Sequence, residues 1–377
     1  MKRFMLCIAL SVGLAACGPQ EQTADKAKAV QPAGDVVAGK AVADKFCKGC
    51  HGLDGRGTAP AIPHLAAQRE RYLAESIAEY KEGKRTHAAL KDMTARLSDA
   101  DVRNAVAYYA SLPPLAAPEG KAPLVFPYER GRTLAAQCAS CHGPDGNSTT
   151  PGTPSLAGQQ PQYFIAAIQE YHQGDRLLPA MRPFLRGAGK LELESLALYF
   201  ASQTPAQRPA PAVGDPAAGE PLTGACAGCH GIRGISMDSA TPTLAGQDPQ
   251  YLAAATRAYG KTRRHPIMEA QVSKLSERDI LNIAAYYAVQ KPSPAAKGEG
   301  LVNQLAEKCN RCHGETVENP AMVVPKLSGQ DKDYLVMALR AYRDDRRESS
   351  TMHRMSLPFS DAIIDGIAAL YANQPAR

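Results

Sequence analysis

The chain has 377 residues, which is enough for two ordinary domains or for several small ones. Its formal net charge is +6, and two of the positive charges, Lys2 and Arg3, stand at the extreme N-terminus. The charge that remains is too small to give nucleic-acid binding electrostatic support.

The first residues are typical of an export signal. Lys2 and Arg3 precede an apolar run over residues 4–14, and small residues follow. The run is too short to span a bilayer comfortably. We therefore expect a signal peptide over residues 1–16 and a mature protein in the bacterial periplasm.

The segment Leu-Ala-Ala-Cys that ends at Cys17 resembles the lipobox of bacterial lipoproteins. The resemblance implies lipidation of Cys17, a membrane anchor, and a flexible tether over residues 17–34. Gly18, where the inner-membrane retention signal of that family has Asp, favours the outer membrane over the inner one. An ordinary cleaved signal with a chance cysteine is the alternative.

The pattern Cys-x-x-Cys-His occurs four times, and it is the attachment signature of c-type haem. The two thiols bond to one haem, and the histidine that follows binds its iron. The sequence therefore predicts four covalently bound haems c, which leave the ferric holoprotein roughly neutral. The predicted attachment cysteines and proximal iron ligands are Cys47, Cys50 and His51; Cys138, Cys141 and His142; Cys226, Cys229 and His230; Cys309, Cys312 and His313.

The similarity among the four segments extends well past the haem motif, so a whole domain repeats. Each copy has a Gly before the motif, a Pro-x-Leu-small-small-Gln segment after it, and a closing apolar helix with aromatic residues. The predicted haem domains, here repeats 1 to 4, cover residues 35–113, 124–203, 214–291 and 297–377.

The sequence predicts an all-α fold. Residues 98–112 carry apolar residues at helical spacing, with Ser98 and Asp101 as a capping box, and Ser276 with Asp279 repeats that box. No segment shows sustained two-residue alternation.

A Pro- and Ala-rich segment over residues 203–218 indicates a semi-rigid spacer near the middle of the chain. We therefore expect two dihaem halves, about 35–202 and 214–377, each with two consecutive domains.

The distal iron ligands are predicted by aligning the closing helices. Eight residues before each helix stands a Met in repeats 2 to 4, but Leu90 in repeat 1. Met93, three residues after Leu90, lies on roughly the same face of a helix. Core packing is the ordinary role of Met, and Met355 is an alternative in repeat 4. The predicted distal ligands are Met93, Met181, Met268 and Met352.

Histidines outside the motifs leave one other ligation open. His87 and His265 occupy equivalent positions, so bis-His ligation is conceivable in repeats 1 and 3. The favoured interpretation is that both histidines are exposed polar residues. His64 and His172 have no counterparts and are expected at the surface.

The Pro after each motif offers a carbonyl that could accept a hydrogen bond from the proximal His, with a plain turn as the alternative. These residues are Pro63, Pro154, Pro242 and Pro325.

Each repeat also carries an Arg five positions after a Tyr. Its side chain could pair with a haem propionate or a neighbouring domain, or cap a helix end. The four are Arg85, Arg176, Arg264 and Arg347. Basic clusters at 261–264 and 340–347 are candidate docking faces, although a solvated face is the more ordinary interpretation.

With these motifs, each repeat resembles a class I cytochrome c domain and each half resembles the dihaem cytochrome c4 family. The Pro-x-Leu-Ala-Gly-Gln segments at Pro154 and Pro242 and the aromatic closing helices carry the resemblance. It implies His/Met iron, periplasmic electron transfer, and paired domains that face each other across their propionate edges. The chain departs from the family in having four motifs, a lipobox, and Leu90 in place of a ligating Met.

The expected function is single-electron transfer between a quinol- or dehydrogenase-linked donor and a terminal oxidase or reductase, with no enzyme activity. One alternative is a haem enzyme, a peroxidase or small-oxyanion oxidoreductase, that uses an open haem in repeat 1. Another is a fixed haem subunit of a larger membrane redox complex.

Overall fold

The structure is a computed structural model that describes residues 33–116, 124–181, 188–259, 261–294, 297–314 and 322–376. Residues 34–377 form one compact unit. The predicted signal peptide, Cys17 and nearly all of the tether lie outside the described residues. In the described segments the regular structure is helical, with isolated β-bridges only, and none of their helices is long and apolar enough to cross a membrane.

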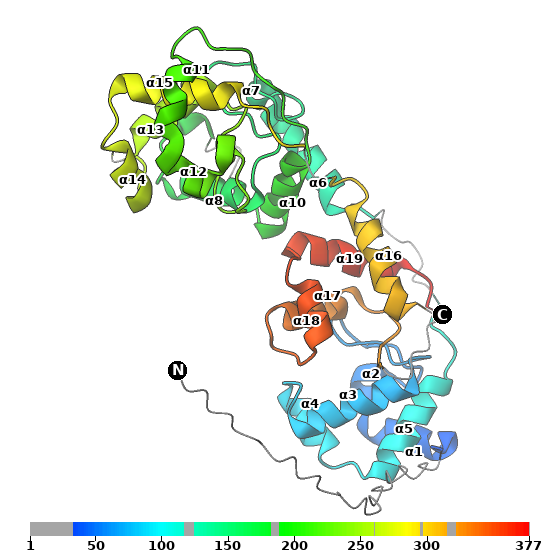
Figure 1. Cartoon of the computed structure of the whole chain (residues 1–377). Coiled ribbons are helices and arrows are strands. Elements are labelled where there is room, and N and C mark those ends of the chain that lie inside the picture. Colours follow the sequence, from blue (N-terminus) through cyan, green and yellow to red (C-terminus); the bar gives the residue numbers. More distant parts are fainter. Residues whose placement is uncertain are drawn as a thin grey trace, which may run out of the picture. The chain divides into compact units, whose positions relative to one another are not determined.

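Each repeat is built on the same plan. A first helix leads into the Cys-x-x-Cys-His motif, a helix follows the conserved Gln, a short helical turn carries the predicted distal residue, and a long helix closes the repeat (Figure 1). In repeats 1 and 2 the helices are α1 (Val36–Phe46), α2 (Lys48–His51), α3 (Glu70–Glu82), α4 (Ala88–Thr94), α5 (Asp99–Ser111), α6 (Pro127–Ala135), η1 (Ala136–Cys138), α7 (Ala139–His142), α8 (Pro161–Gln173), η2 (Pro179–Met181) and α10 (Lys190–Ala201). In repeats 3 and 4 they are α11 (Pro216–Gly219), η3 (Glu220–Thr223), α12 (Gly224–His230), η4 (Ile232–Gly234), α13 (Pro249–Ala258), α14 (Pro266–Val272), α15 (Glu277–Val289), α16 (Leu301–His313), α17 (Lys332–Arg343), α18 (Ser350–Ser356) and α19 (Asp361–Asn373).

The closing helices begin where the sequence predicts. Ser98 and Ser276 each accept a hydrogen bond from the backbone of the third helical residue, whose carboxylate accepts one in return, so both capping boxes are confirmed. Each closing helix buries its aromatic face, and every repeat has a hydrophobic cluster of its own. The four clusters explain why the sequence repeats at the length of a domain.

The first and last helices of a repeat cross in close contact, and a glycine makes the crossing possible. A Cβ on Gly39 would lie 2.0 Å from the carbonyl oxygen of Asn104, and Gly131 and Gly219 meet α10 and α15 in the same way. Repeat 4 differs, because Gly300 is the N-cap of α16 and does not serve the crossing. There the glycine is on the other helix: a Cβ on Gly366 of α19 would lie 2.9 Å from Val302 of α16 and 2.9 Å from Pro127 of repeat 2, so this glycine serves a contact between repeats as well.

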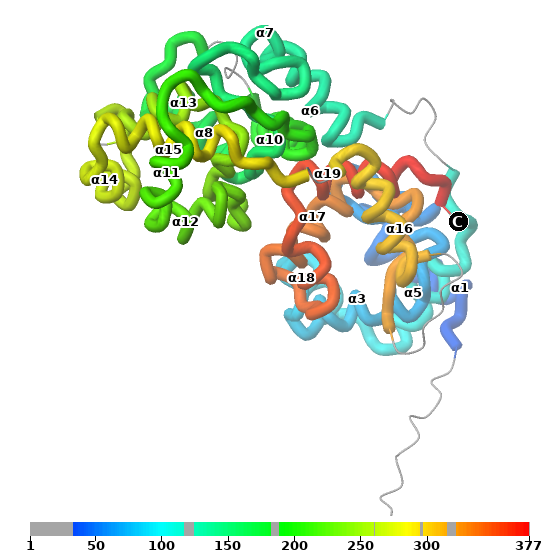
Figure 2. Tube along the Cα trace, turned by 45° about the horizontal axis from the view of Figure 1, so that its top comes forward, coloured from blue at the N-terminus to red at the C-terminus, as the bar shows by residue number. Residues whose placement is uncertain are grey.

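The repeats pair in a nested order, so the expectation of two consecutive halves is wrong for the contacts of this chain. Hydrogen bonds join residues 61–72 of repeat 1 to residues 314–347 of repeat 4, and residues 152–160 of repeat 2 to residues 236–248 of repeat 3. In Figures 1 and 2, α16–α19 lie beside α1–α5, and α11–α15 lie beside α6–α10. The second pair is therefore inserted between the members of the first.

The Pro- and Ala-rich segment 203–218 is packed against both members of the inner pair and does not separate them. Arg208 donates to the carbonyl oxygens of Ser148 in repeat 2 at 2.7 Å and of Gly246 in repeat 3 at 3.0 Å. The amide N–H of Ala206 donates to Oδ1 of Asn147 at 2.7 Å. Because a Pro-rich chain is extended whether it is solvated or packed, its composition did not distinguish the two cases.

The two pairs touch through repeats 2 and 4. Lys190 at the start of α10 forms an ion pair with Asp361 at the start of α19, with Nζ and Oδ2 2.7 Å apart. The backbone N–H of Ala362 donates to Oε2 of Glu194 at 2.7 Å. Asp361 also accepts from Arg343, so this part of the basic run 340–347 forms internal ion pairs and is no free docking face.

Candidate haem sites

The four predicted proximal histidines are held alike. Each ends the helix that carries its motif, and its Nδ1 lies within hydrogen-bonding distance of the carbonyl oxygen of the Pro that follows twelve residues later. These hydrogen bonds were predicted and are confirmed. The four distances are 3.0 Å for His51 and Pro63, 2.8 Å for His142 and Pro154, 2.9 Å for His230 and Pro242, and 2.9 Å for His313 and Pro325.

This contact fixes the protonation of the ring. A carbonyl oxygen only accepts, so Nδ1 carries the proton and Nε2 keeps its lone pair. Burial lowers the pKa of all four histidines, and only the hydrogen bond to the Pro carbonyl opposes that shift. A neutral imidazole with a free Nε2 is the form that binds iron.

The cysteines of each motif differ in burial. The first packs against the hydrophobic cluster of its own repeat, while the second is more exposed in repeats 1 to 3. Burial raises the pKa of the Cys47 thiol to about 11, so this environment disfavours a thiolate. An uncharged thioether suits the position, and the residues of the motif therefore fit a covalently attached haem.

The short helices place the predicted distal residues in register. α4, α14 and α18 begin after the N-caps His87, His265 and Ser349, whose side chains each accept from the backbone N–H three residues later. Those third positions hold Leu90, Met268 and Met352, so the alignment made from sequence is confirmed for repeats 1, 3 and 4, while ligation itself stays a prediction. In repeat 2, Met181 ends η2 and packs against the cluster of its repeat.

Met93 and Met355 both lie one helical turn after that register position. Met93 is half-buried, and Met352 is too, whereas the side chain of Met355 is 41% exposed. Of the two Met residues in repeat 4, Met352 is therefore the better placed to reach a buried iron.

The other histidines have structural roles. His87 and His265 are exposed and use Nδ1 to cap helices, which speaks against bis-His ligation in repeats 1 and 3. His172 is exposed, as expected. His64 is a correction: it is half-buried at the boundary with repeat 4, and its Nδ1 accepts from the backbone N–H of Gly57 at 3.0 Å.

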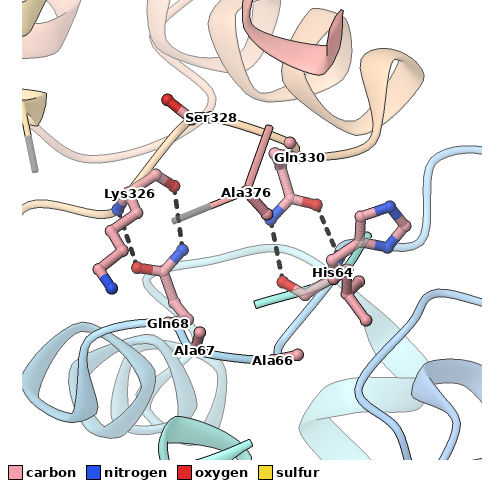
Figure 3. Close-up of a pocket in the computed structure, with 10 residues that line it drawn as sticks. His64, Ala66, Ala67, Gln68, Lys326, Ser328, Gln330 and Ala376 are labelled. Carbon is pink, nitrogen blue, oxygen red and sulfur yellow. Dashed lines mark hydrogen bonds between the residues drawn. The ribbon is translucent and has the colours of Figure 1, made fainter. Parts of the chain in front are cut away.

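The Gln that recurs after each Pro-x-Leu segment reaches into the partner repeat. Sequence reasoning noted this Gln without assigning it a role. Gln68 accepts from the N–H of Lys326 at 2.8 Å and donates to its carbonyl oxygen at 3.0 Å. Gln330 does the same to His64, at 2.6 Å and 2.9 Å (Figure 3). Repeats 2 and 3 exchange the same contacts through Gln159 and Gln247.

A buried cluster of Tyr and Arg lies beside each of these glutamine pairs. Nη2 of Arg347 donates to the hydroxyl of Tyr72 at 3.2 Å, and that oxygen is 3.4 Å from the hydroxyl oxygen of Tyr334. Burial acts to raise the pKa of Tyr72, but Arg347 and Arg85 outweigh it and bring the pKa to about 8. The inner pair has a similar cluster, but there each Arg donates to a Tyr of its own repeat, Arg176 to Tyr163 and Arg263 to Tyr251.

The Arg of repeat 3 in this cluster is Arg263, and the prediction of Arg264 is wrong. α13 ends at Ala258 and Tyr259 is already extended. The buried Arg follows this Tyr by four residues, whereas the buried Arg of each other repeat follows its Tyr by five. Arg264 is exposed.

Two of the buried guanidinium groups have no anionic partner among the residues that the structure describes. Arg85 pairs with Glu79 and Arg176 with Glu170, whereas in the described segments no carboxylate lies within ion-pair distance of Arg263 or Arg347. Nε of Arg347 is buried with no hydrogen-bond partner. A buried cation is costly unless an anion pairs with it, so these sites fit the propionates of a haem.

Comparison with known proteins identifies the family. The cytochrome c family matches residues 36–113 and 128–190. Cytochrome c4 of Pseudomonas aeruginosa is 37% identical over 155 residues, which cover 38% of this chain and 74% of the relative. The chain belongs to the cytochrome c4 family. It is a helical haem protein with covalently bound haem c that transfers electrons with redox protein partners.

Two further relatives show how the chain compares with others. A thiosulfate dehydrogenase electron acceptor of Thiomonas intermedia is 31% identical over 179 residues, covering 42% of this chain and 82% of that protein. The crystal structure of reduced recombinant cytochrome c4 from Pseudomonas stutzeri is 28% identical and has a TM-score of 0.40. The match covers 44% of this chain and 100% of the chain in that crystal structure.

Proposed function

We propose that the protein is a tetrahaem electron carrier of the bacterial periplasm, with one covalent haem c at each Cys-x-x-Cys-His motif. The observation that carries this proposal is the fourfold recurrence of one proximal site, in which the His donates Nδ1–H to a Pro carbonyl. A haem held there supplies a one-electron couple. The two Cys thiols of each motif would hold the haem covalently, and the Pro carbonyl would orient the His imidazole that binds its iron.

The distal ligands in this proposal are Met93, Met181, Met268 and Met352, which together close every iron to substrates. Arg347 and Arg263 neutralise propionates at the two interfaces between repeats. The protein is exported through residues 1–16 and anchored by a lipid on Cys17, with the outer membrane favoured.

The partners in this proposal are a respiratory donor and a terminal oxidase or reductase. The similarity to a thiosulfate dehydrogenase electron acceptor favours a dehydrogenase-linked donor over a quinol-linked one. A permanent complex with such a partner would show as co-purification from solubilised membranes, whereas a carrier would be recovered alone.

A haem count and a spectroscopic redox titration test this function. We expect four haems per chain in the pyridine haemochrome assay and the near-infrared band of Met-ligated ferric haem from all of them. A count below four, or Met ligation at fewer than three irons, would contradict the tetrahaem carrier.

A haem enzyme is the second candidate, and Leu90 is the observation that favours it, because it stands at the register of Met268 and Met352. If Met93 does not reach the iron, the first haem is open. Carbon monoxide added to the reduced protein distinguishes the two: a carrier resists it at all four haems, and an enzyme binds it at haem 1.

A further inference from the structure

One peptide unit at the boundary between repeats 1 and 4 has a hydrogen bond at each of its two polar groups. The carbonyl of Pro63 accepts from Nδ1 of His51 at 3.0 Å. The N–H of the same peptide, on His64, donates to Oε1 of Gln330 at 2.6 Å. A side chain of repeat 4 is therefore one peptide away from the proximal histidine of repeat 1. Figure 3 shows the contact between Gln330 and His64.

The relation is reciprocal. The peptide between Pro325 and Lys326 accepts from His313 at 2.9 Å and donates to Gln68 of repeat 1 at 2.8 Å. In the inner pair, the N–H groups of Ser155 and Thr243, which follow the two Pro carbonyls, donate to Gln247 at 2.7 Å and to Gln159 at 2.9 Å.

The glutamines are rigidly placed. All four are at most 8% exposed, and the Oε1 of each also accepts from the backbone N–H of the residue that follows it. The Nε2 donates to a carbonyl of the partner segment, so both the oxygen and the nitrogen of the amide are hydrogen-bonded. A fixed dipole of this kind acts on the peptide in every copy of the site.

We propose that Gln68, Gln159, Gln247 and Gln330 are positioning residues that tune the proximal histidine of the partner repeat, so that each pair of repeats, 1 with 4 and 2 with 3, is also a redox-coupled pair. The proposal rests on haem being bound as described above. An acceptor on the peptide N–H polarises the peptide and makes its carbonyl a stronger acceptor. The imidazole then becomes more basic, which stabilises ferric iron and lowers the potential of that haem.

The test is the effect of a glutamine variant on the haem of the other repeat. Gln330→Leu removes the acceptor at similar volume, so we expect the midpoint potential of haem 1 to rise while haems 2 and 3 keep theirs. Gln330→Glu strengthens the acceptor, so the potential of haem 1 should fall below the wild-type value. Haem-methyl NMR resonances, assigned with single-motif variants, identify which haem moves.

Matched variants separate tuning from structural damage. Gln68→Leu should act on haem 4 and Gln247→Leu on haem 2, while Gln304→Leu on the exposed side of α16 should change none. Amide hydrogen exchange gives a readout that does not depend on redox state, because His64 loses its acceptor in Gln330→Leu and keeps it in Gln330→Glu.

Two outcomes would overturn the proposal. If both substitutions at Gln330 shift the potential in the same direction, the residue only holds the interface together. If the shift stays with haem 4, on its own repeat, the tuning does not cross the boundary. A failure of the proposed function would instead appear in the unmodified protein, as a haem count below four or a missing Met band.

Discussion

At the residue scale, the four candidate haem sites agree on the proximal side and differ on the distal side. The proximal contact depends on a backbone carbonyl, which every repeat supplies at the same spacing. The distal contact depends on one side chain, and repeat 1 has Leu90 at the position that holds Met in repeats 3 and 4. Variation in the predicted iron ligands is therefore concentrated at Leu90.

The choice between the two Met residues of repeat 4 can be tested directly. Met352→Leu should remove about a quarter of the near-infrared band, because one of four irons loses its thioether, and should open that iron to carbon monoxide. Met355→Leu is the control and should leave both unchanged, since its side chain is 41% exposed. The reverse pattern would assign the ligand to Met355.

The ion pairs of Asp361 give a dependence on pH. Burial acts to raise the pKa of this carboxyl, but Lys190, Arg343 and Arg340 outweigh it and lower the pKa to about 2. A depressed pKa contributes stability above the ordinary value for Asp, about 3.9, and that stability is lost as pH falls towards 2.

We therefore expect Asp361→Asn to flatten the dependence of thermal stability on pH between about 4 and 2, the window set by the unfolded and folded pKa values. Asp333→Asn, at an exposed position of α17, should keep the wild-type slope. Equal slopes in all three proteins would show that the Asp361 cluster contributes no stability.

At the element scale, each repeat is held by the crossing of its first and last helices, and only one helix of each crossing pair needs the glycine. Repeats 1 to 3 have it on the first helix, at Gly39, Gly131 and Gly219, and repeat 4 has it on the last, at Gly366. Sequence comparison aligned Gly300 with the first three because it also precedes a motif. The Gly before each motif could not by itself show which copies serve a crossing, because the constraint is on the distance between two helices, which a pattern in one helix does not contain.

Gly131→Ala should destabilise repeat 2, because the new Cβ would lie 2.1 Å from the carbonyl oxygen of Ser195. Overpacking of this kind typically costs about 1–3 kcal/mol. Gly224→Ala in α12 is a matched control, since nothing lies within 4 Å of its new Cβ. Urea titrations followed by circular dichroism compare the two, and equal midpoints would contradict the role of the crossing.

At the scale of the whole molecule, the decisive feature is nested pairing. The residue after the Gln that recurs in each repeat indicates which repeats pair, and sequence reasoning missed it. Asp248 and Asp331 accept from backbone N–H groups of repeats 2 and 1, at 2.9 Å and 2.8 Å. Arg69 and Gln160 instead donate to carbonyls of repeats 4 and 3, at 2.8 Å and 2.7 Å.

In each pair, a repeat with a long donor side chain after the Gln (Arg69 or Gln160) thus contacts a repeat with Asp at the same position. Repeats 1 and 2 carry a donor at this position, and repeats 3 and 4 carry Asp. Repeats 1 and 2 therefore cannot pair with each other in this way. The pattern still permits repeat 1 to pair with repeat 3 or with repeat 4, and the contacts choose repeat 4.

Electron exchange should follow the nested pairs, because the haem-binding segments meet within a pair, whereas the two pairs touch through α6, α10 and α19. A ruthenium photosensitiser on Met237→Cys, an exposed position 93% accessible in repeat 3, would inject an electron at haem 3. Met181→His lowers the potential of haem 2 and should abolish the fast equilibration phase.

Met352→His is the matched control for that experiment. It lowers the potential of haem 4, which belongs to the other pair, and should leave the fast phase unchanged. Loss of the fast phase in Met352→His, with its retention in Met181→His, would restore pairing between consecutive repeats.

The sequence by itself determined the cofactor chemistry, the all-helical repeats, the capping boxes and the register of the distal residues. These features depend on spacing along one chain, which is visible in the letters. The tertiary structure alone decided which repeats pair, that Arg263 replaces Arg264, that His64 is enclosed, and what the conserved glutamines bind. Each of these depends on contacts between segments far apart in the sequence, and the four repeats are too alike for composition to choose among their possible partners.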